Sequence, residues 1–156
     1  MYKNIYALVD IQSTNVGSST LDEAFALAKF SGAKLKIKHF IKLEEEVQNS
    51  IMDGGIYFMN LEKKIQWFID GVYDRGLREG IIVEVDVEKT FHGDTTGIIL
   101  DDLKDWGADL VIMGCSHKLG SILHIFSDRF IEKLSNKTRL PILLVHAANH
   151  LSHSPQ

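Results

Sequence analysis

This sequence lacks the features that mark several classes of protein. It has a single cysteine, Cys115, so no disulfide can form within the chain, and such sparing use of cysteine favours the reducing cytoplasm. No apolar run approaches the roughly 18 residues that a membrane span requires, and the opening residues do not have the pattern of a signal peptide. The net charge of −4 offers no basic surface for nucleic acid. We therefore expect a cytoplasmic protein without a membrane segment or a nucleic-acid partner.

The common enzyme signatures are also missing. The sequence contains no G-x-x-x-x-G-K-[ST] loop, no G-x-G-x-x-G after the first predicted strand and no G-x-S-x-G elbow. Cys115 has no evident base partner that would make it a nucleophile. Residues 11–14 (IQST) do not match the serine- and glycine-rich loop of the adenylating pyrophosphatases. The sequence therefore predicts a protein that is not an enzyme.

What is present is the pattern of a single α/β domain. At 156 residues and 45% hydrophobic content, the chain is long and apolar enough for one domain with a full core. Apolar strand segments alternate with amphipathic helical segments, which favours a five-stranded parallel sheet with helices on both faces and right-handed crossovers. The predicted strands are residues 5–10, 35–41, 81–87, 110–113 and 140–145. The predicted helices have their apolar faces in residues 21–28, 61–72, 98–106 and 130–134.

Turn and cap residues suggest where these segments end. Residues 11–19 are turn formers, and the capping-box spacing of Thr20–Glu23 predicts the start of the first helix. Glycines at 32, 80 and 107 are placed to end three helices. Residues 42–56 are predicted to form a mobile loop with room for one helical turn, and residues 147–156 a disordered tail. Because acids alternate with valines in residues 81–87, that strand is expected near a sheet edge, with one face exposed to solvent.

The most informative stretch runs from Asp109 to Arg129. An apolar strand lies between Asp109 and Gly114, a glycine-containing loop follows, and Ser127 or Asp128 can cap the next helix. A loop that leaves the carboxyl end of a buried parallel strand and feeds a helix is a common anion site, because unpaired N–H groups point outward there. The position of this loop therefore predicts a phosphate-binding site.

Four segments, in order and at matching separations, make residues 2–146 resemble the universal stress protein family. They are YKNIYALVD at 2–10, DEAFALAKFSGAKLKIKHF at 22–40, GADLVIMG at 107–114 and LPILLVH at 140–146. The resemblance implies a Rossmann-like fold, similar to the adenine nucleotide α hydrolases, with strand order 3-2-1-4-5. It also implies a universal stress protein domain over residues 1–146 and an adenine nucleotide crevice between the first and fourth strands.

The resemblance also assigns site residues, and at some of these positions the chain departs from the family pattern. Val9 and Asp10 match the positions that face adenine and ribose, and Phe40 matches a position whose backbone contacts adenine. Met113 and Gly114 end the fourth strand, and Gly114 matches the first glycine of the phosphate pattern G-x-x-G-x9-G-[ST]. The rest of that pattern is altered, because His117 and Ser127 replace glycines and Asp128 replaces the final Ser/Thr, while Gly120 matches a further glycine common in the family.

These departures bear directly on phosphate binding. Histidine can adopt the left-handed backbone of a glycine at some cost. Asp128 places a carboxylate where a triphosphate carries its charge, and two such groups away from bulk water repel by on the order of a few kcal/mol. The hydroxyl of Ser127 and the charges of Lys118 and Arg129 partly offset that repulsion. The family contains ATP binders as well as members that lack the full pattern and do not bind.

Three functional hypotheses follow from these residues. The first is a non-catalytic stress-response regulator with a degenerate nucleotide site, which forms a homodimer through the apolar edge strand Ile142–Val145, as family members commonly do. The second is a switch protein that binds ATP or AMP, with Mg²⁺, and hydrolyses it slowly at most. The third is a module for another small molecule, for which His117 and Phe40 offer stacking surfaces.

Several other polar residues admit both a functional and a structural interpretation. Asp10 is either a ribose or catalytic acid or the cap of the next turn, and Cys115 is either a redox sensor or a small strand residue. His39 is expected to be packed or bonded to backbone rather than to a metal. The histidines at 146, 150 and 153 either bind a transition metal adventitiously or belong to a solvated tail. The acids at 44–46 and 101–102 are expected to lie on solvated faces.

Overall fold

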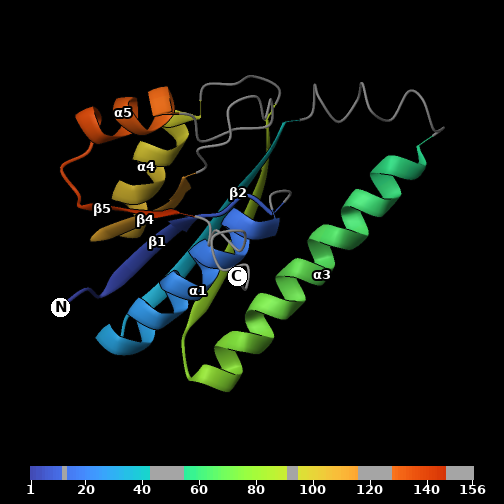
Figure 1. The fold of residues 1–156 in the computed structure, drawn as a ribbon, viewed down its shortest axis with the longest axis horizontal. Helices are drawn as coiled ribbons and strands as arrows, with labels where there is room; N and C mark the ends of the chain where they lie inside the picture. Colours follow the sequence, from blue (N-terminus) through green and yellow to red (C-terminus); the bar gives the residue numbers. More distant parts are fainter. Residues whose placement is uncertain (12–13, 43–54, 91–94, 116–127, 147–156) are drawn as a thin grey trace, which may run out of the picture.

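The chain folds around one parallel sheet in the order β3-β2-β1-β4-β5 (Figure 1). This arrangement is seen in a computed structural model, which describes residues 1–11, 14–42, 55–90, 95–115 and 128–146. The strands are β1 (Asn4–Leu8), β2 (Lys34–Lys42), β3 (Val83–Thr90), β4 (Leu110–Cys115) and β5 (Ile142–His146). The helices in these ranges are α1 (Thr14–Ser31), α3 (Ile56–Glu79), α4 (Thr96–Trp106) and α5 (Asp128–Lys137). The predicted fold class and strand order are therefore confirmed.

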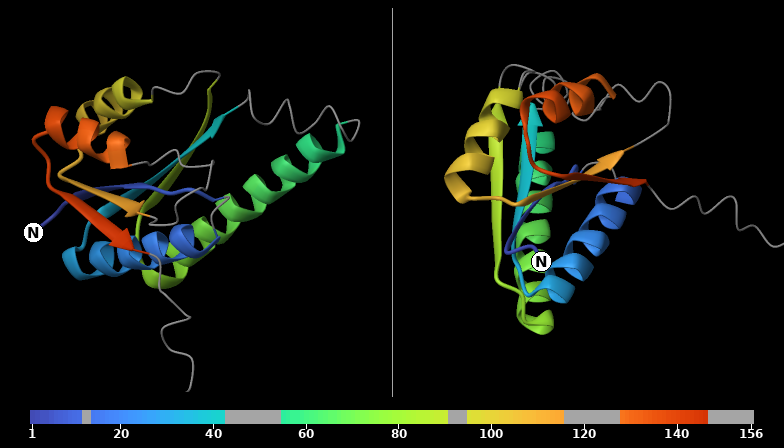
Figure 2. Two further views of the ribbon diagram at one scale, coloured as in Figure 1. Left: turned by 45° about the horizontal axis from the view of Figure 1, so that its top comes forward. Right: turned by 90° about the vertical axis from the view of Figure 1, so that its left-hand side faces the viewer.

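Helices cover both faces of the sheet, with α1 and α3 on one face and α4 and α5 on the other (Figure 2). Alternate residues of each strand enter one of two hydrophobic clusters. The first cluster packs Ile5, Ala7 and Ile37 beneath α1 and α3, with Phe25 of α1 fully buried. The second packs Tyr6, Leu8 and Val111 beneath α4 and α5, with Leu134 of α5 fully buried. The central strands thus have apolar residues on both faces, as their continuous apolar sequences predict.

The first helix begins earlier than its sequence signals indicate. The capping-box spacing predicts a start at Thr20, with turns over residues 11–19, but α1 begins at Thr14. Thr20 itself is fully buried inside the helix, where its side chain does not act as an exposed cap. Packing against a sheet supplies most of a helix's stability and outweighs the weak helix propensity of serine, glycine and threonine. The prediction of a turn across residues 14–19 is therefore wrong.

The ends of the helices agree better with the sequence. Gly32, Gly80 and Gly107 all have left-handed backbone conformations, with φ values of 68°, 72° and 73°. The N–H of Gly80 donates to the carbonyl of Gly76, which closes the last turn of α3. That helix begins at Ile56, five residues before the apolar stripe that predicts it, and the rest of the predicted loop, residues 43–54, lies outside the described residues.

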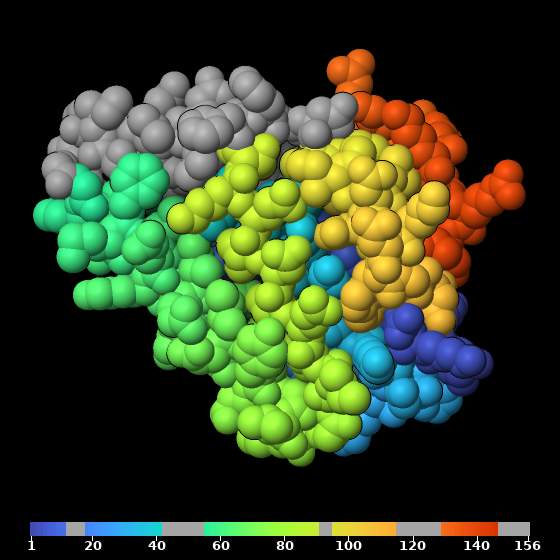
Figure 3. Space-filling model, turned by 180° about the vertical axis from the view of Figure 1, so that it is seen from behind, coloured from blue at the N-terminus to red at the C-terminus, as the bar shows by residue number. Residues whose placement is uncertain are grey.

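The two edges of the sheet differ in chemistry. The β3 edge carries Glu84, Asp86, Glu88 and Lys89, and in the space-filling view β3 lies across the surface between α3 and α4 (Figure 3). The β5 edge consists of ILLVH, and Pro141 directly precedes it. Both strands stand at edges as predicted. Charged residues protect an edge from pairing with another chain, and β5 has fewer of them.

Among the described helices, none combines the length and the apolar character needed to cross a bilayer.

Candidate functional site

The carboxyl ends of β1 and β4 meet at the centre of the sheet, where the sequence predicts the nucleotide crevice. Leu8 of β1 pairs with Met113 of β4, and the chain then leaves the two strands toward opposite faces, to α1 and to α5 (Figure 2). Such a divergence is where open α/β sheets bind ligands. The predicted residues Val9, Asp10, Met113 and Gly114 lie here, all buried. The structure therefore brings these four together.

The side chain of His39 separates β1 from β2 at this point. The N–H of Val9 donates to the carbonyl of Lys38 at 2.9 Å. A continued parallel ladder would next join Phe40 to Val9 and Ile11. The His39 imidazole takes these positions instead, with Nδ1 2.9 Å from the carbonyl oxygen of Val9 and 3.5 Å from the amide nitrogen of Ile11. We assign the proton to Nδ1, which donates to Val9, because the shorter contact is with a carbonyl.

This arrangement leaves the backbone of Phe40 directed toward the crevice. β1 stops pairing at Leu8, opposite Lys38, whereas β2 continues to Lys42 along β3. The N–H and C=O groups of Phe40 point to the β1 side, and among the described residues neither has a hydrogen-bond partner on that side. A neighbouring donor and acceptor of this kind match the edge of a purine base. The His39 prediction is confirmed, since the imidazole is 1% exposed and bonded to backbone.

The Phe40 side chain does not have the role that the third hypothesis gives it. Its ring is 1% exposed and packs in the cluster beneath α4. The Lys38 ammonium lies 5.2 Å from the ring centroid on that same side. A ring that is buried in the core offers no stacking surface to a ligand, so this expectation is wrong for Phe40.

A buried lysine lies between the sheet and α4, close to the end of β1. Lys38, whose side chain is 2% exposed, places its ammonium nitrogen 2.5 Å from Asp86, 2.7 Å from Glu88 and 3.0 Å from Asp102. The buried hydroxyl of Tyr6 donates to the same Asp102 oxygen at 2.9 Å. We call Tyr6, Lys38, Asp86, Glu88 and Asp102 the lysine cluster. Three carboxylates satisfy the three N–H donors of the ammonium, so β2, β3 and α4 are joined at one point.

The lysine cluster shifts the acid–base equilibria of its members. Burial on its own would lower the pKa of Lys38, but hydrogen bonds from Asp86, Glu88 and Asp102 outweigh it and raise that pKa. Burial would raise the pKa of Asp102, yet hydrogen bonds from Lys38 and Tyr6 lower it. Burial, with the nearby Asp102 charge, raises the pKa of Tyr6 far above its ordinary value. At neutral pH the cluster therefore holds a charged lysine, a charged Asp102 and a neutral tyrosine.

This cluster is not among the sites predicted from the sequence. Asp101 is exposed as expected, but Asp102 is only 26% exposed and bonds to Lys38. The signal was present in the strand patterns. Lysines alternate along β2 at 36 and 38, and acids alternate along β3 at 84, 86 and 88 in the matching register. Two neighbouring strands with complementary alternation predict cross-strand ion pairs.

The remaining predicted site residues are not placed by the structure. His117, Gly120 and Ser127 lie outside the described residues, and Asp128 is the first residue of α5. The acids at 44–46, the tail and its histidines 150 and 153 also lie outside them. Within the described ranges, no group of three or more histidine, cysteine, aspartate and glutamate side chains is arranged to hold a metal ion.

Several solved structures of similar fold are described as universal stress proteins. One from Burkholderia pseudomallei has a TM-score of 0.65 and 19% identity, over 92% of this chain and 96% of that chain. One from Archaeoglobus fulgidus, described as a complex with dAMP, has a TM-score of 0.58 and 16% identity over 92% and 98%. A third, described as a complex with cAMP, has a TM-score of 0.56 and 14% identity over 93% and 97%.

At these identities the similarity establishes the fold, and the family comes from the sequence itself. A comparison with curated protein sequences found no significant match. The model of the universal stress protein family, in contrast, matches residues 1–146, which span every described strand and helix. The chain belongs to the universal stress protein family.

Proposed function

We propose that this protein is a non-catalytic, cytoplasmic stress-response regulator that acts as a homodimer and has a degenerate adenine nucleotide crevice. The observation that carries the proposal is the contrast between the two halves of the crevice. The residues that match the adenosine positions of the family are all present, and Val9, Asp10 and Phe40 lie at the carboxyl ends of neighbouring strands, β1 and β2. The phosphate side departs from the family pattern at His117, Ser127 and Asp128. A protein that keeps the crevice but not the phosphate pattern is better suited to binding than to phosphate chemistry.

The dimer is proposed on the properties of β5. Its five residues include no lysine, arginine, aspartate or glutamate, and Leu144 is 38% exposed. The opposite edge, β3, carries four such charges. A row of open hydrogen-bonding groups flanked by apolar side chains is favourable for pairing with a second copy, and in a closed C₂ dimer each copy would present the same strand.

The dimer proposal is tested by measuring molar mass in solution. We expect light scattering at micromolar concentration to give twice the 17.6 kDa of one chain. Leu144→Lys places a charge on the β5 edge and is expected to yield a monomer of unchanged circular dichroism. Ile82→Lys, at another strongly exposed apolar position, is the control that leaves the dimer intact. A wild-type protein that is strictly monomeric would contradict the proposal.

A second candidate function, an ATP- or AMP-binding switch, is favoured by the relatives. Two solved relatives are described as complexes with cAMP and dAMP, both of which carry a single phosphate. A monophosphate brings less negative charge toward Asp128 than a triphosphate does, so the repulsion that disfavours ATP is weaker for AMP. In this hypothesis Val9, Asp10 and the Phe40 backbone hold the adenosine, and the loop that starts at Gly114 holds the phosphate.

The two candidates are separated by thermal shift of nucleotide-stripped protein with AMP, ADP and ATP, with and without Mg²⁺. A ligand at 100 times its Kd adds roughly 2.7 kcal/mol of stability, which raises the Tm of a domain this size by several degrees. We expect no shift with ATP and a larger response after Asp128→Ser, because a hydroxyl donor replaces a repelling carboxylate. Glu132→Ser, which removes an exposed carboxylate one turn further along α5, is the matched control.

Each result of this titration has a definite meaning. A clear shift of the wild-type protein with AMP identifies a nucleotide-dependent switch. No shift with any nucleotide supports the non-binding regulator. An ATP affinity that Asp128→Ser leaves unchanged would show that charge repulsion at this position is not what limits binding.

A further inference from the structure

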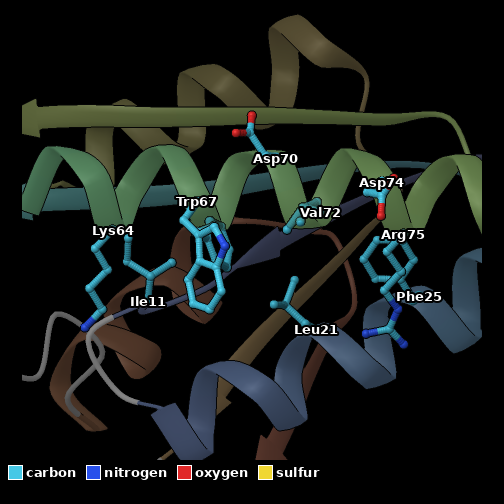
Figure 4. A pocket seen from close by; sticks show the side chains of 11 residues that line it. Ile11, Leu21, Phe25, Lys64, Trp67, Asp70, Val72, Asp74 and Arg75 are labelled. Atoms are coloured by element: carbon cyan, nitrogen blue, oxygen red, sulfur yellow. The ribbon is translucent and has the colours of Figure 1, made fainter.

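A cavity lies between α1 and α3 (Figure 4). It is on the face of the sheet opposite the lysine cluster. Its volume is about 750 Å³, within the range of pockets that hold small molecules. The apolar part of its wall is formed by Ile11, Leu21, Phe25, Trp67, Phe68 and Val72. We call this cavity the helix groove. An apolar cavity of this size in a folded domain is a candidate ligand site.

The wall of the helix groove includes an exposed indole. Trp67 of α3 is 81% exposed, yet its ring points toward α1, with Leu21 directed toward it from the other wall (Figure 4). A tryptophan left this exposed loses the favourable burial of a large apolar surface. An exposed aromatic ring beside a preformed hollow offers apolar surface that a ligand could cover.

Four charged side chains line the helix groove: Lys64, Asp70, Asp74 and Arg75. Asp74 pairs with Arg78, with 3.8 Å between the carboxylate oxygen and the guanidinium nitrogen. Asp70 accepts a hydrogen bond from Gln66 at 2.8 Å and points away from the groove (Figure 4). Arg75 stacks on Phe25, 4.3 Å from the ring centroid, and pairs with Asp22 and Glu79. Lys64 forms no ion pair with any described residue, and its ammonium lies at one end of the groove (Figure 4). An ammonium in this position attracts a negatively charged group of a ligand.

The length of the helix groove limits the size of the ligand. Lys64 and Arg75 are eleven residues apart on one helix, which corresponds to about 16 Å at 1.5 Å per residue. A ligand whose charge lies at Lys64 thus has an apolar wall of this length beside it, past Trp67 and Leu21 to Phe25. An extended hydrocarbon chain with one charged end has this shape.

We propose that the helix groove binds an amphipathic carboxylate of the medium-chain fatty acid class. The carboxylate lies against Lys64, and the hydrocarbon chain packs between Trp67 and the apolar side chains of α1. The groove is formed by α1 and α3 and reaches the end of β1 at Ile11 alone among its lining residues, whereas the nucleotide crevice is predicted at the ends of β1 and β4. The fatty acid proposal does not require nucleotide binding.

Trp67 itself provides the reporter for the test. The chain has two tryptophans, and Trp106 is on the far face in α4, so Trp106→Phe leaves Trp67 as the single indole. Dodecanoate, below its micellar concentration, is expected to shift the Trp67 emission to the blue in a saturable manner. Dodecanol, which has the same chain without the charge, is expected to bind about two- to fivefold more weakly, as for an exposed ion pair.

Two pairs of variants locate the site. Gly71 lines the groove and an added Cβ there meets nothing within 4 Å, so Gly71→Phe is expected to occupy the groove and weaken dodecanoate binding at least tenfold. Gly97→Phe, in equally open space on α4, is the control that leaves binding unchanged. Lys64→Gln is expected to reduce dodecanoate affinity two- to fivefold without affecting dodecanol, whereas the exposed neighbour Lys63→Gln changes neither.

The outcomes that would overturn the proposal are equally specific. If Gly71→Phe binds dodecanoate as tightly as the parent, the ligand does not occupy the helix groove. If dodecanol binds as tightly as dodecanoate and Lys64→Gln has no effect, the site is an apolar surface without selectivity for an anion. The absence of any saturable change in Trp67 emission would exclude the ligand class.

Discussion

Replacement of Lys38 by methionine is expected to lower the free energy of unfolding by about 3 kcal/mol at pH 7. The substitution keeps the length of the side chain but leaves the carboxylates of Asp86, Glu88 and Asp102 facing each other without a cation. Removal of one partner from a buried ion pair costs about 3–5 kcal/mol, and the lower value applies here because Asp86 and Glu88 are 40% and 38% exposed. Urea unfolding measures the difference.

A matched substitution separates the cluster from a general effect of removing charge. Lys34→Met removes a lysine from the start of the same strand, where the side chain is exposed. A surface change of this kind is expected to alter stability by less than about 0.5 kcal/mol. Equal losses from both variants would contradict the role given to the lysine cluster.

The pH dependence tests whether charge, rather than packing, causes the loss. In the wild-type protein the pKa of Asp102 is lowered, so the stability it contributes is present above the ordinary carboxyl pKa and disappears as pH falls through the lower folded value. In Lys38→Met the carboxylates repel each other, and protonation relieves that repulsion. The stability difference between the two proteins is therefore expected to narrow as pH falls from 7 toward 4. A constant difference would indicate a packing defect instead.

The second large effect is expected at Gly76, where α3 meets β3. A Cβ at this position would lie 2.7 Å from Cγ2 of Val83 and 2.9 Å from the carbonyl oxygen of Ile81. The oxygen belongs to the backbone that follows the helix cap, so it has little freedom to move. Gly76→Ala is expected to lower the free energy of unfolding by about 1–3 kcal/mol, although alanine favours the helix.

The same change one and a half turns earlier is expected to have the opposite sign. Gly71 also lies in α3, but nothing is within 4 Å of an added Cβ. Gly71→Ala should raise the free energy of unfolding by about 0.5–1 kcal/mol, because alanine loses less backbone entropy in a helix. Denaturant unfolding of both variants checks the pair. If both substitutions stabilise the protein, the close approach of α3 and β3 does not constrain this position.

Local signals along the chain determined much of the fold. The apolar runs around Ala7 and Ile112 predicted strands that are buried on both faces, and glycines 32, 80 and 107 marked three helix ends. These features depend on a residue's own conformational preference or on the period of its neighbours, so the sequence alone is sufficient. Helix starts were less certain, as Thr14 in place of Thr20 shows, because sheet packing outweighs weak propensities there.

The sequence likewise predicted some features of the candidate site and not others. The family pattern placed Val9, Asp10 and Gly114 at the crevice, since a motif is read along the chain. It did not show that the His39 imidazole bonds to the Val9 carbonyl and so leaves the Phe40 backbone unpaired with β1. That arrangement depends on where the two strands stop pairing. The loop residues His117 and Ser127 remain sequence-based assignments.

Only the tertiary structure decided the lysine cluster and the helix groove. Lys38 and Asp102 are 64 positions apart in the sequence and become neighbours when α4 packs on the sheet. Trp67 and Leu21 face each other because α1 and α3 lie side by side on the other face (Figure 4). The sequence by itself determined which segments form strands and helices, and which family they belong to. The packing of those segments determined which charges and apolar side chains meet, because such contacts depend on distances in space and not on spacing along the chain.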